Sequence, residues 1–177
     1  MKRDLSIPLS TATVYILLFL VPMMALLILP YNAIWGLESL LDGMYRFADW
    51  PSFLFVILIG VPLHELIHAL AWMWFGRIFL KEIRFGVKAL TPYAHCKVPI
   101  RARAYRIGAF MPAFLLGFLP YAIGLIGGDG WFTSLGLVFI FAAGGDLLVL
   151  WALRGVDGEA WVEDHPSRAG CYVMDET

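Results

Sequence analysis

Four long apolar stretches constrain the fold of this chain more than any other feature of its sequence. They lie at about residues 13–29, 53–75, 107–126 and 131–153, and an α-helix needs roughly 20 apolar residues to cross a bilayer. The composition agrees, because 60% of the 177 residues are hydrophobic and only 15% are charged. A typical soluble domain has about 25% charged residues. The sequence therefore predicts an all-α membrane protein with four transmembrane helices, in a single domain over residues 1–177.

The first stretch has two possible interpretations. Lys2 and Arg3 followed by an apolar run are typical of a signal peptide, but this run is long and lacks a small-x-small cleavage site. We interpret it as a retained anchor. The third and fourth stretches are separated only by residues 127–130, so we expect them to form an antiparallel helical hairpin.

The basic residues are distributed unevenly between the connecting segments. Twelve of the thirteen Lys and Arg residues lie at the N-terminus, in segment 76–106 or after the fourth stretch, and only Arg46 lies between the first two stretches. The positive-inside rule therefore predicts a multi-pass cell-membrane protein with both termini and segment 76–106 in the cytoplasm. We expect the basic segment to face lipid headgroups rather than nucleic acid. Cys96 and Cys171 would then lie in a reducing compartment, where a disulfide is not expected.

Segment 76–106 contains two short runs in which apolar and polar residues alternate. Ile83, Phe85 and Val87 form the apolar positions of the first run, and the second run has Ala94, Cys96 and Val98, with Thr91-Pro92 between the runs. A period of two predicts a short cytoplasmic β-hairpin between the second and third membrane helices. In the polar and acidic tail, residues 170–173 are expected to form another short strand.

The predicted spans contain four ionisable side chains, which are His64, Glu65 and His68 in the second span and Asp146 in the fourth. Such groups cost about 2.5–3.5 kcal/mol or more each at the centre of a membrane helix, so they mark candidate functional sites. His64-Glu65-Leu66-Ile67-His68 is an HExxH motif. Positions i and i+4 share one helix face, so the two imidazoles can bind one Zn²⁺ while Glu65 acts as general base. The alternative is a hydrogen-bonded polar patch that holds helices together.

A catalytic zinc site normally has three protein ligands, and Asp146 is the predicted third. His68 and Asp146 each lie seven residues before the cytoplasmic end of their span, which is a depth of roughly 10 Å in both helices. Gly144 and Gly145 precede Asp146 and would allow close approach of the two helices. The alternative third ligands, or partners of the ligands, are His95, Asp157, Asp164 and His165.

Four motifs together resemble the putative zincin peptidases, a family of prokaryotic integral membrane proteins. They are HELIHA in the second span, the YAHCKVPI…YR stretch, a Pro-containing third span and GGD in the fourth. The similarity extends from about residue 50 to the C-terminus. More distantly, HExxH with a later Asp resembles the site-2 proteases, intramembrane zinc enzymes that cut membrane-anchored substrates. The resemblance implies zinc ligands at His64, His68 and Asp146, a catalytic carboxylate at Glu65, and a substrate-presenting strand within residues 82–98.

The sequence departs from the site-2 proteases around Asp146, which lacks the Asn and Pro that precede the Asp of that family. The chain has no Gln, and its one Asn, Asn32, is predicted in a loop on the opposite side of the membrane. Stabilisation of an oxyanion would therefore come from zinc, from backbone N–H groups, or from His95 or Tyr93. His95 and Tyr93 are accordingly candidate substrate-binding residues or partners of the zinc ligands.

These features predict a membrane-embedded zinc metallopeptidase that hydrolyses a peptide bond of a membrane-associated peptide or protein near the cytoplasmic side. Zn²⁺ would activate a water molecule, and Glu65 would accept its proton. The alternatives are a metal-dependent membrane hydrolase of a lipid-linked substrate, a non-enzymatic metal-binding scaffold, and a divalent-metal permease. The outer halves of the predicted spans lack ionisable residues, which argues against a permease.

Overall fold

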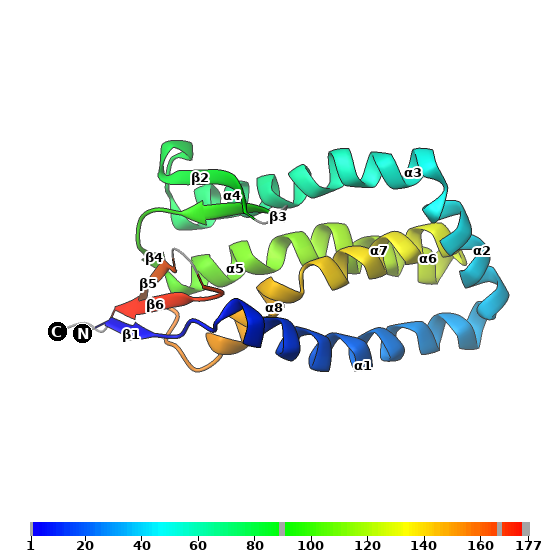
Figure 1. Cartoon of the computed structure of the whole chain (residues 1–177), viewed down its shortest axis with the longest axis horizontal. Coiled ribbons are helices and arrows are strands. Elements are labelled where there is room, and N and C mark those ends of the chain that lie inside the picture. Colours follow the sequence, from blue (N-terminus) through cyan, green and yellow to red (C-terminus); the bar gives the residue numbers. More distant parts are fainter. Residues whose placement is uncertain (1, 89–90, 166–167, 175–177) are drawn as a thin grey trace.

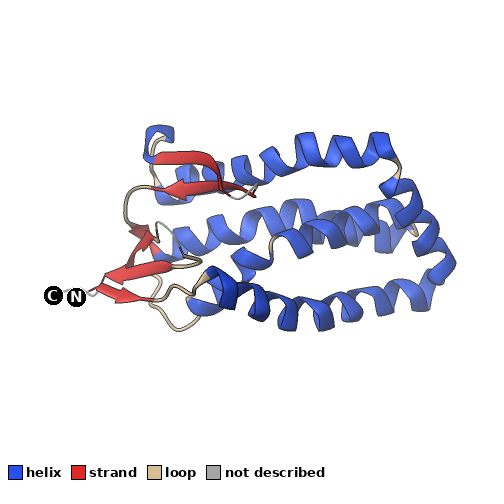
Figure 2. Cartoon of the chain, in the orientation of Figure 1, coloured by secondary structure: helices blue, strands red, loops and turns tan. Residues whose placement is uncertain are grey.

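The apolar stretches form long helices, and short strands gather at one end of them. The computed structural model describes residues 2–88, 91–165 and 168–174. In Figure 1 the helices run side by side along the long axis, and both chain ends lie together beside the strands. Figure 2 shows that the strands occupy that end of the molecule. The mostly helical fold with small antiparallel sheets confirms the coarse prediction from the sequence.

Three helical segments are long and apolar enough to cross a membrane, at Ser10–Trp35, Trp50–Gly76 and Ala102–Gly127. They contain the first three predicted spans. The fourth differs from the prediction, because α7 (Gly130–Ala142) and α8 (Gly144–Ala152) are bent by 49°. Gly144 begins α8 and packs against α1 (Leu9–Trp35), not against the second span as expected, since a Cβ there would lie 2.5 Å from Leu20. Asp146 therefore lies in the first turn of a separate short helix.

The second and third spans each contain a π-helical segment beside proline. Segment η1 (Val56–Gly60) joins α3 (Trp50–Phe55) to α4 (Val61–Gly76) and ends two residues before Pro62. Segment η3 (Ala113–Phe118) joins α5 (Ala102–Pro112) to α6 (Leu119–Gly127). Proline has no N–H and its ring collides with the carbonyl four residues earlier, and a widened turn accommodates both effects. The HExxH motif thus begins one turn after such a widened segment.

The segment between the first two spans contains a helix that we did not predict, α2 (Leu37–Ala48). Its buried residues are Leu40, Gly43 and Phe47, which follow the helical spacing of three to four residues. Gly43 lies against α7, where an added Cβ would be only 2.0 Å from the Gly130 backbone. Asn32, predicted in a loop, lies instead within α1 (Leu9–Trp35), at the end of that helix far from the strands (Figure 1).

A two-stranded hairpin lies between α4 and α5, after the short 3₁₀ helix η2 (Leu80–Glu82). Strands β2 (Ile83–Lys88) and β3 (Thr91–Cys96) pair antiparallel, with Ile83 opposite Cys96 and Lys88 opposite Thr91. Thr91 and Pro92 therefore belong to the second strand rather than to the connection, and residues 89–90 lie outside the described residues. Strand β3 packs against α4, the helix that carries the HExxH motif.

A second, four-stranded antiparallel sheet ties the two ends of the chain together. Its strand order is β1-β6-β5-β4, formed by β1 (Lys2–Asp4), β4 (Ile100–Arg101), β5 (Trp161–Asp164) and β6 (Cys171–Met174). The strand expected at 170–173 is thus present, one residue later. Its core includes Ile100, Val162 and Val173, which pack with Trp72 of α4 and Tyr105 of α5. This packing fixes the C-terminal tail at the end of α4 and α5.

Candidate metal centre

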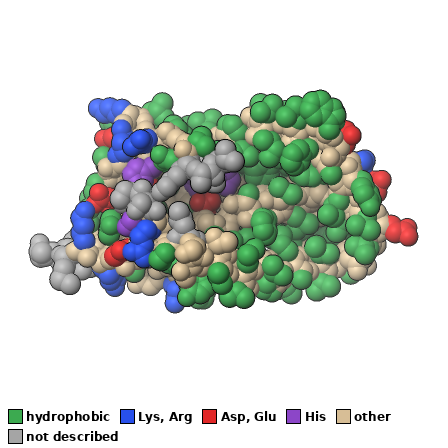
Figure 3. All heavy atoms as spheres, in the orientation of Figure 1, with side chains coloured by type: hydrophobic (Ala, Val, Ile, Leu, Met, Phe, Trp, Pro, Cys, Tyr) green, Lys and Arg blue, Asp and Glu red, His purple; other side chains and the backbone are tan. Residues whose placement is uncertain are grey.

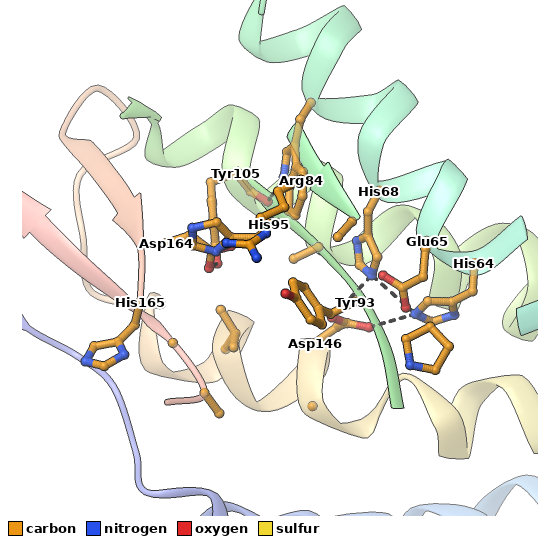
Figure 4. Close-up of a pocket in the computed structure, with 18 of the residues that line it drawn as sticks. His64, Glu65, His68, Arg84, Tyr93, His95, Tyr105, Asp146, Asp164 and His165 are labelled. Atoms are coloured by element: carbon orange, nitrogen blue, oxygen red, sulfur yellow. Dashed lines mark hydrogen bonds and ion pairs between the residues drawn. The ribbon is translucent and has the colours of Figure 1, made fainter. Parts of the chain in front are cut away.

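Two histidines and one aspartate converge where α4 approaches α8. His64 and His68 come from α4 and Asp146 from α8, and their ligand atoms all lie within 4.8 Å of one another. His64 Nε2 is 3.2 Å from His68 Nε2 and 3.2 Å from Asp146 Oδ2, and His68 Nε2 is 3.4 Å from Asp146 Oδ1 (Figure 4). Among the described residues, this is the one group of three or more His, Cys, Asp or Glu side chains placed closely enough to hold a metal ion.

Local packing holds the two imidazoles in place. The His64 ring stacks on Phe139 of α7 with the ring centroids 6.5 Å apart. The His68 ring stacks on Trp72, at 5.4 Å, and Trp72 stacks in turn on Tyr105, at 5.7 Å. Both histidines are buried, so their orientations are fixed by neighbouring rings rather than by solvent.

The orientation of His68 also fixes its neutral tautomer. Its Nδ1 lies 2.9 Å from the Gly108 carbonyl oxygen of α5, and because a carbonyl can only accept, Nδ1 carries the proton. Nε2 then presents its lone pair towards His64 and Asp146. Metal-binding histidines commonly donate their other ring nitrogen to an acceptor in this way. Sequence reasoning expected such an acceptor but did not identify Gly108.

Gly108 is required at this position by the packing of Trp72. A Cβ on residue 108 would lie 2.1 Å from the indole of Trp72, much closer than two heavy atoms can approach. The absence of a side chain lets the indole lie against α5, where its Nε1 donates to the Tyr105 carbonyl at 3.3 Å. The same close approach brings His68 to the Gly108 oxygen.

The donor set of this cluster fits a zinc ion. Two imidazole nitrogens and one carboxylate are the ligands found in many catalytic zinc sites, which keep a further position for water or substrate. The cluster turns these acceptor atoms towards one another at 3.2–3.4 Å, and a cation between them would satisfy all three. A divalent ion would also offset the charge of Asp146, which is costly inside a membrane span.

Glu65 lies next to this cluster in a cavity of about 560 Å³. Its side chain is half-buried, and Ala94 of β3 lines the same cavity. The cavity extends from the cluster to the hairpin and the C-terminal tail, and its polar lining includes Arg84, Tyr93, His95, Tyr105, Asp164, His165 and Arg168. The HExxH carboxylate and the hairpin therefore share one hollow (Figure 4).

Asp164 organises the other end of the cavity. Its Oδ1 accepts the Tyr105 hydroxyl at 2.7 Å, and its Oδ2 accepts the Cys96 backbone N–H at 3.3 Å and lies 3.0 Å from His95 Nδ1. The hydrogen bond that His95 donates to Asp164 raises the pKa of His95 above its ordinary value. Burial raises the pKa of the neighbouring Cys96 thiol to about 11, so the thiol is neutral at physiological pH.

The structure places the four alternative third ligands away from His64 and His68. His95 and Asp164 pair with each other. Asp157 lies in the turn after α8, where it accepts the Glu159 backbone N–H at 2.8 Å. His165 accepts the Arg168 backbone N–H at 2.9 Å and its ring lies against Tyr172. Only Asp146 of these five candidates joins the two histidines.

Sequence reasoning missed Trp72, Tyr105 and Gly108, which hold His68 and Asp164. One signal was present for Trp72, because it follows His68 by four residues and so shares the face of α4 that carries the motif. Tyr105 and Gly108 had no such signal. Their roles arise from the packing of α5 on α4, which no local pattern specifies.

The part of the chain that carries this cluster matches a known protein family. A family model described as putative zincin peptidase matches residues 57–161, a range that contains His64, Glu65, His68 and Asp146. The match confirms the family resemblance drawn from the motifs. Neither a curated protein nor a solved structure matches the chain.

Proposed function

The chain belongs to the putative zincin peptidase family, and on that premise we propose that it is a membrane-embedded zinc metallopeptidase. Its substrate would be a membrane-associated peptide or protein, cleaved near the cytoplasmic side. The observation that carries this proposal is the convergence of His64, His68 and Asp146 beside Glu65 in one cavity. A polar patch that only held helices together would not need a cavity or a further carboxylate beside it.

His64, His68 and Asp146 would hold the zinc ion. The ion supplies Lewis acidity, because it lowers the pKa of water and polarises a carbonyl group. Glu65 takes a proton from the attacking water as the water oxygen bonds to the carbonyl carbon. When the C–N bond breaks, Glu65 gives the proton to the amine nitrogen that leaves. The Gly108 carbonyl keeps the His68 lone pair directed into the site throughout.

We also propose the membrane orientation expected from the sequence. Apolar side chains cover the long helices in Figure 3, whereas the Lys and Arg side chains gather mainly at the strand end. Acidic side chains are seen at the opposite end, near α2, which carries Glu38 and Asp42. The distribution of basic residues supports four spans, counting α7 and α8 as one, with the strand end in the cytoplasm. The cavity would then receive water from the cytoplasm.

Impermeant thiol labelling of intact cells tests this orientation. A cysteine at position 42, on the exposed face of α2, should be labelled from outside, whereas a cysteine at the exposed position 97 should react only after the membrane is opened. The native cysteines Cys96 and Cys171 are buried and provide a low background. Efficient outside labelling at position 97 would reverse the proposed orientation.

Paired variants of the purified chain test the enzyme itself. Glu65→Gln should keep about one zinc per chain and lose cleavage of membrane-anchored reporter peptides, whereas His68→Ala should lose both. The matched control is Glu38→Gln, which makes the same change at an exposed position on α2 and should leave both unchanged. Zinc is measured by mass spectrometry and cleavage by the appearance of new peptide termini. Full cleavage by Glu65→Gln would contradict the peptidase proposal and favour a scaffold.

A further inference from the structure

The cavity-facing side of the hairpin carries two basic side chains in a single cross-strand pair. Arg84 of β2 lies directly opposite His95 of β3, and the next pair on the same face is Gly86 with Tyr93. Directly opposite residues have Cβ atoms about 4.5–5.5 Å apart, and a like-charged pair is destabilising there unless something compensates it. Arg84, Tyr93 and His95 all line the cavity that holds Glu65.

His95 has one ring nitrogen committed and one available. Its Nδ1 is held by Asp164 at 3.0 Å, so Nε2 is the nitrogen left for another partner. The side chain is 24% exposed, and the hydrogen bond to Asp164 favours the protonated ring by raising the pKa of His95. Protonated His95 therefore offers an Nε2–H donor whose direction Asp164, Tyr105 and Cys96 fix through their own hydrogen bonds.

The other charges around His95 leave Arg84 uncompensated. Within the described part of the chain, no carboxylate lies within ion-pair distance of Arg84. Glu163, the next acidic residue to Asp164, is paired with Lys2 at 2.6 Å. Arg168 bonds Asp4 and the Ser6 carbonyl. Arg84 and protonated His95 each carry one positive charge, and Asp164 carries one negative charge. This wall of the cavity therefore has about one net positive charge.

This positive wall lies beside the proposed reaction centre. Strand β3 packs against α4, Ala94 lines the cavity together with Glu65, and His95 is the next residue along β3. One residue of a strand spans roughly 3.3 Å, so a group bound by His95 would lie within one or two residues of a peptide bond placed at Glu65. The Tyr93 ring leaves the wall accessible because it lies across Gly86, where a Cβ would be 2.6 Å from the Tyr93 hydroxyl.

We propose that Arg84 and His95 form a subsite that binds a carboxylate of the substrate peptide next to the bond that is cleaved. The proposal rests on the peptidase function and specifies its substrate class. One net positive charge matches one carboxylate. The Arg84–His95 pair lies in the same cavity as Glu65. This position favours a group carried by the peptide over a lipid phosphate in the headgroup layer. The carboxylate would belong either to an acidic side chain or to the chain terminus of the substrate.

Binding of matched peptides to the full-length zinc-loaded chain tests this subsite without requiring turnover. The protein carries Glu65→Gln, so that peptides are bound and not cut, and is held in uncharged detergent. Three fluorescent acetylated pentapeptides are compared: one with a central Glu and an amidated end, one with Gln in its place, and the Gln peptide with a free C-terminal carboxylate. Because hydrogen bonds between charged groups contribute about 1.5–3 kcal/mol, the preferred carboxylate peptide should bind roughly tenfold or more tightly than the neutral one.

Variants of the hairpin assign the preference to this pair. Arg84→Gln and His95→Gln should each reduce the preference to about twofold or less, and Arg84→Lys should keep part of it because the charge remains. Lys97→Gln is the matched control, since it removes one positive charge from an exposed position just after β3 and should keep the full preference. Zinc content is measured in every variant, so a collapsed metal site is recognised separately.

Three results would overturn the subsite. They are equal affinity for charged and neutral peptides, a preference that survives both Arg84→Gln and His95→Gln, and an equal loss in Lys97→Gln, which would indicate general charge attraction. Displacement of the peptide by glycerophosphate more effectively than by acetate would assign the wall to lipid headgroups instead. Failure of the peptidase proposal has a different signature, because it would appear as absent cleavage by the unaltered Glu65 protein whatever the binding preference.

Discussion

The cavity holds two clusters of histidine and aspartate. In the inner cluster, His64, His68 and Asp146 turn their ligand atoms towards one another. At the other end of the cavity, which we call the mouth, Asp164 accepts hydrogen bonds from the Tyr105 hydroxyl, the Cys96 N–H and His95. Both clusters combine histidine with aspartate, but the mouth supplies a donor for every acceptor that it buries. In the inner cluster neutral His68 uses its one proton on Gly108, so its Nε2 is left as an acceptor that a cation would satisfy. The pairing of donors with acceptors, rather than residue type, therefore distinguishes a metal site from a structural ion pair.

The most direct way to break this distinction is to remove each aspartate in turn. Asp146→Ala should reduce bound zinc from about one per chain towards zero, because two imidazoles alone leave the site one protein ligand short. Asp164→Ala should leave zinc bound, since Asp164 contacts neither His64 nor His68. Metal content of the purified chains, measured at equal folded fraction, decides the matter. Zinc loss from Asp164→Ala with retention in Asp146→Ala would exchange the two roles.

The sequence indicated the inner cluster far better than the mouth. HExxH is local, since i and i+4 share a face in any α-helix, and Asp146 was found because ionisable residues are rare in predicted spans. The prediction placed Asp146 within one continuous fourth span, whereas the structure brings it to α4 from a helix bent by 49° after α7. At the mouth, Asp164 lies on a strand of four residues, β5. Its partners His95 and Tyr105 come from segments about 60 to 70 residues earlier.

The same contrast explains which elements of the fold were missed. Strands β1, β4 and β5 have only two to four residues each, which is too short for an alternating pattern to be distinguished from chance. They are stabilised by pairing between distant segments, such as Lys2 with Met174. Helix α2 is the exception, because its buried residues follow a local helical spacing that the sequence does contain.

Gly108 offers a sharper test, because it acts on the inner cluster without being a ligand. Gly108→Ala places a Cβ 2.1 Å from the Trp72 indole, so Trp72 must move and His68 loses its alignment with the Gly108 carbonyl. Loss of such a hydrogen-bond partner commonly weakens metal binding by roughly 10–100-fold, and we expect a fall in zinc affinity within that range. Competition with a chelator measures it.

Gly127→Ala is the matched control for Gly108→Ala. Gly127 also lies in a helix of the third span, α6, and nothing lies within 4 Å of a Cβ added there. This variant should bind zinc as the unaltered chain does. Equal weakening in both variants would mean that glycine flexibility in the third span, rather than the orientation of His68, controls the metal site.

A smaller effect is expected at the mouth from Tyr105→Phe. The ring and its stacking on Trp72 are kept, but Asp164 Oδ1 loses the hydroxyl that it accepts at 2.7 Å. Leaving one side of a half-buried carboxylate without its donor should lower the free energy of unfolding by about 1–3 kcal/mol and leave zinc content unchanged. Thermal unfolding in detergent measures this loss of stability. The control is Tyr45→Phe, which removes the hydroxyl of a residue that is 77% exposed and should not lower the stability. A loss of zinc from Tyr105→Phe would instead mean that the hydrogen bonds of Asp164 also support the metal site.

The smallest effect is the pH dependence of the pair between His95 and Asp164. Because Asp164 raises the pKa of His95 above 6.5 in the folded chain, the folded state binds the proton more tightly than the unfolded state does. The pair therefore stabilises the fold fully below about pH 6.5, the pKa of an unfolded histidine, and its contribution fades as the pH rises through the folded pKa of His95. The difference in melting temperature between the unaltered chain and His95→Gln should accordingly be largest in mild acid and shrink in mild alkali. Labelled-histidine NMR should show His95 titrating above 6.5 in the unaltered chain and nearer to that value in Asp164→Asn. A difference that grew with rising pH would mean that His95 is held in its neutral form, and Arg84 and Asp164 would then leave no net charge on the cavity wall.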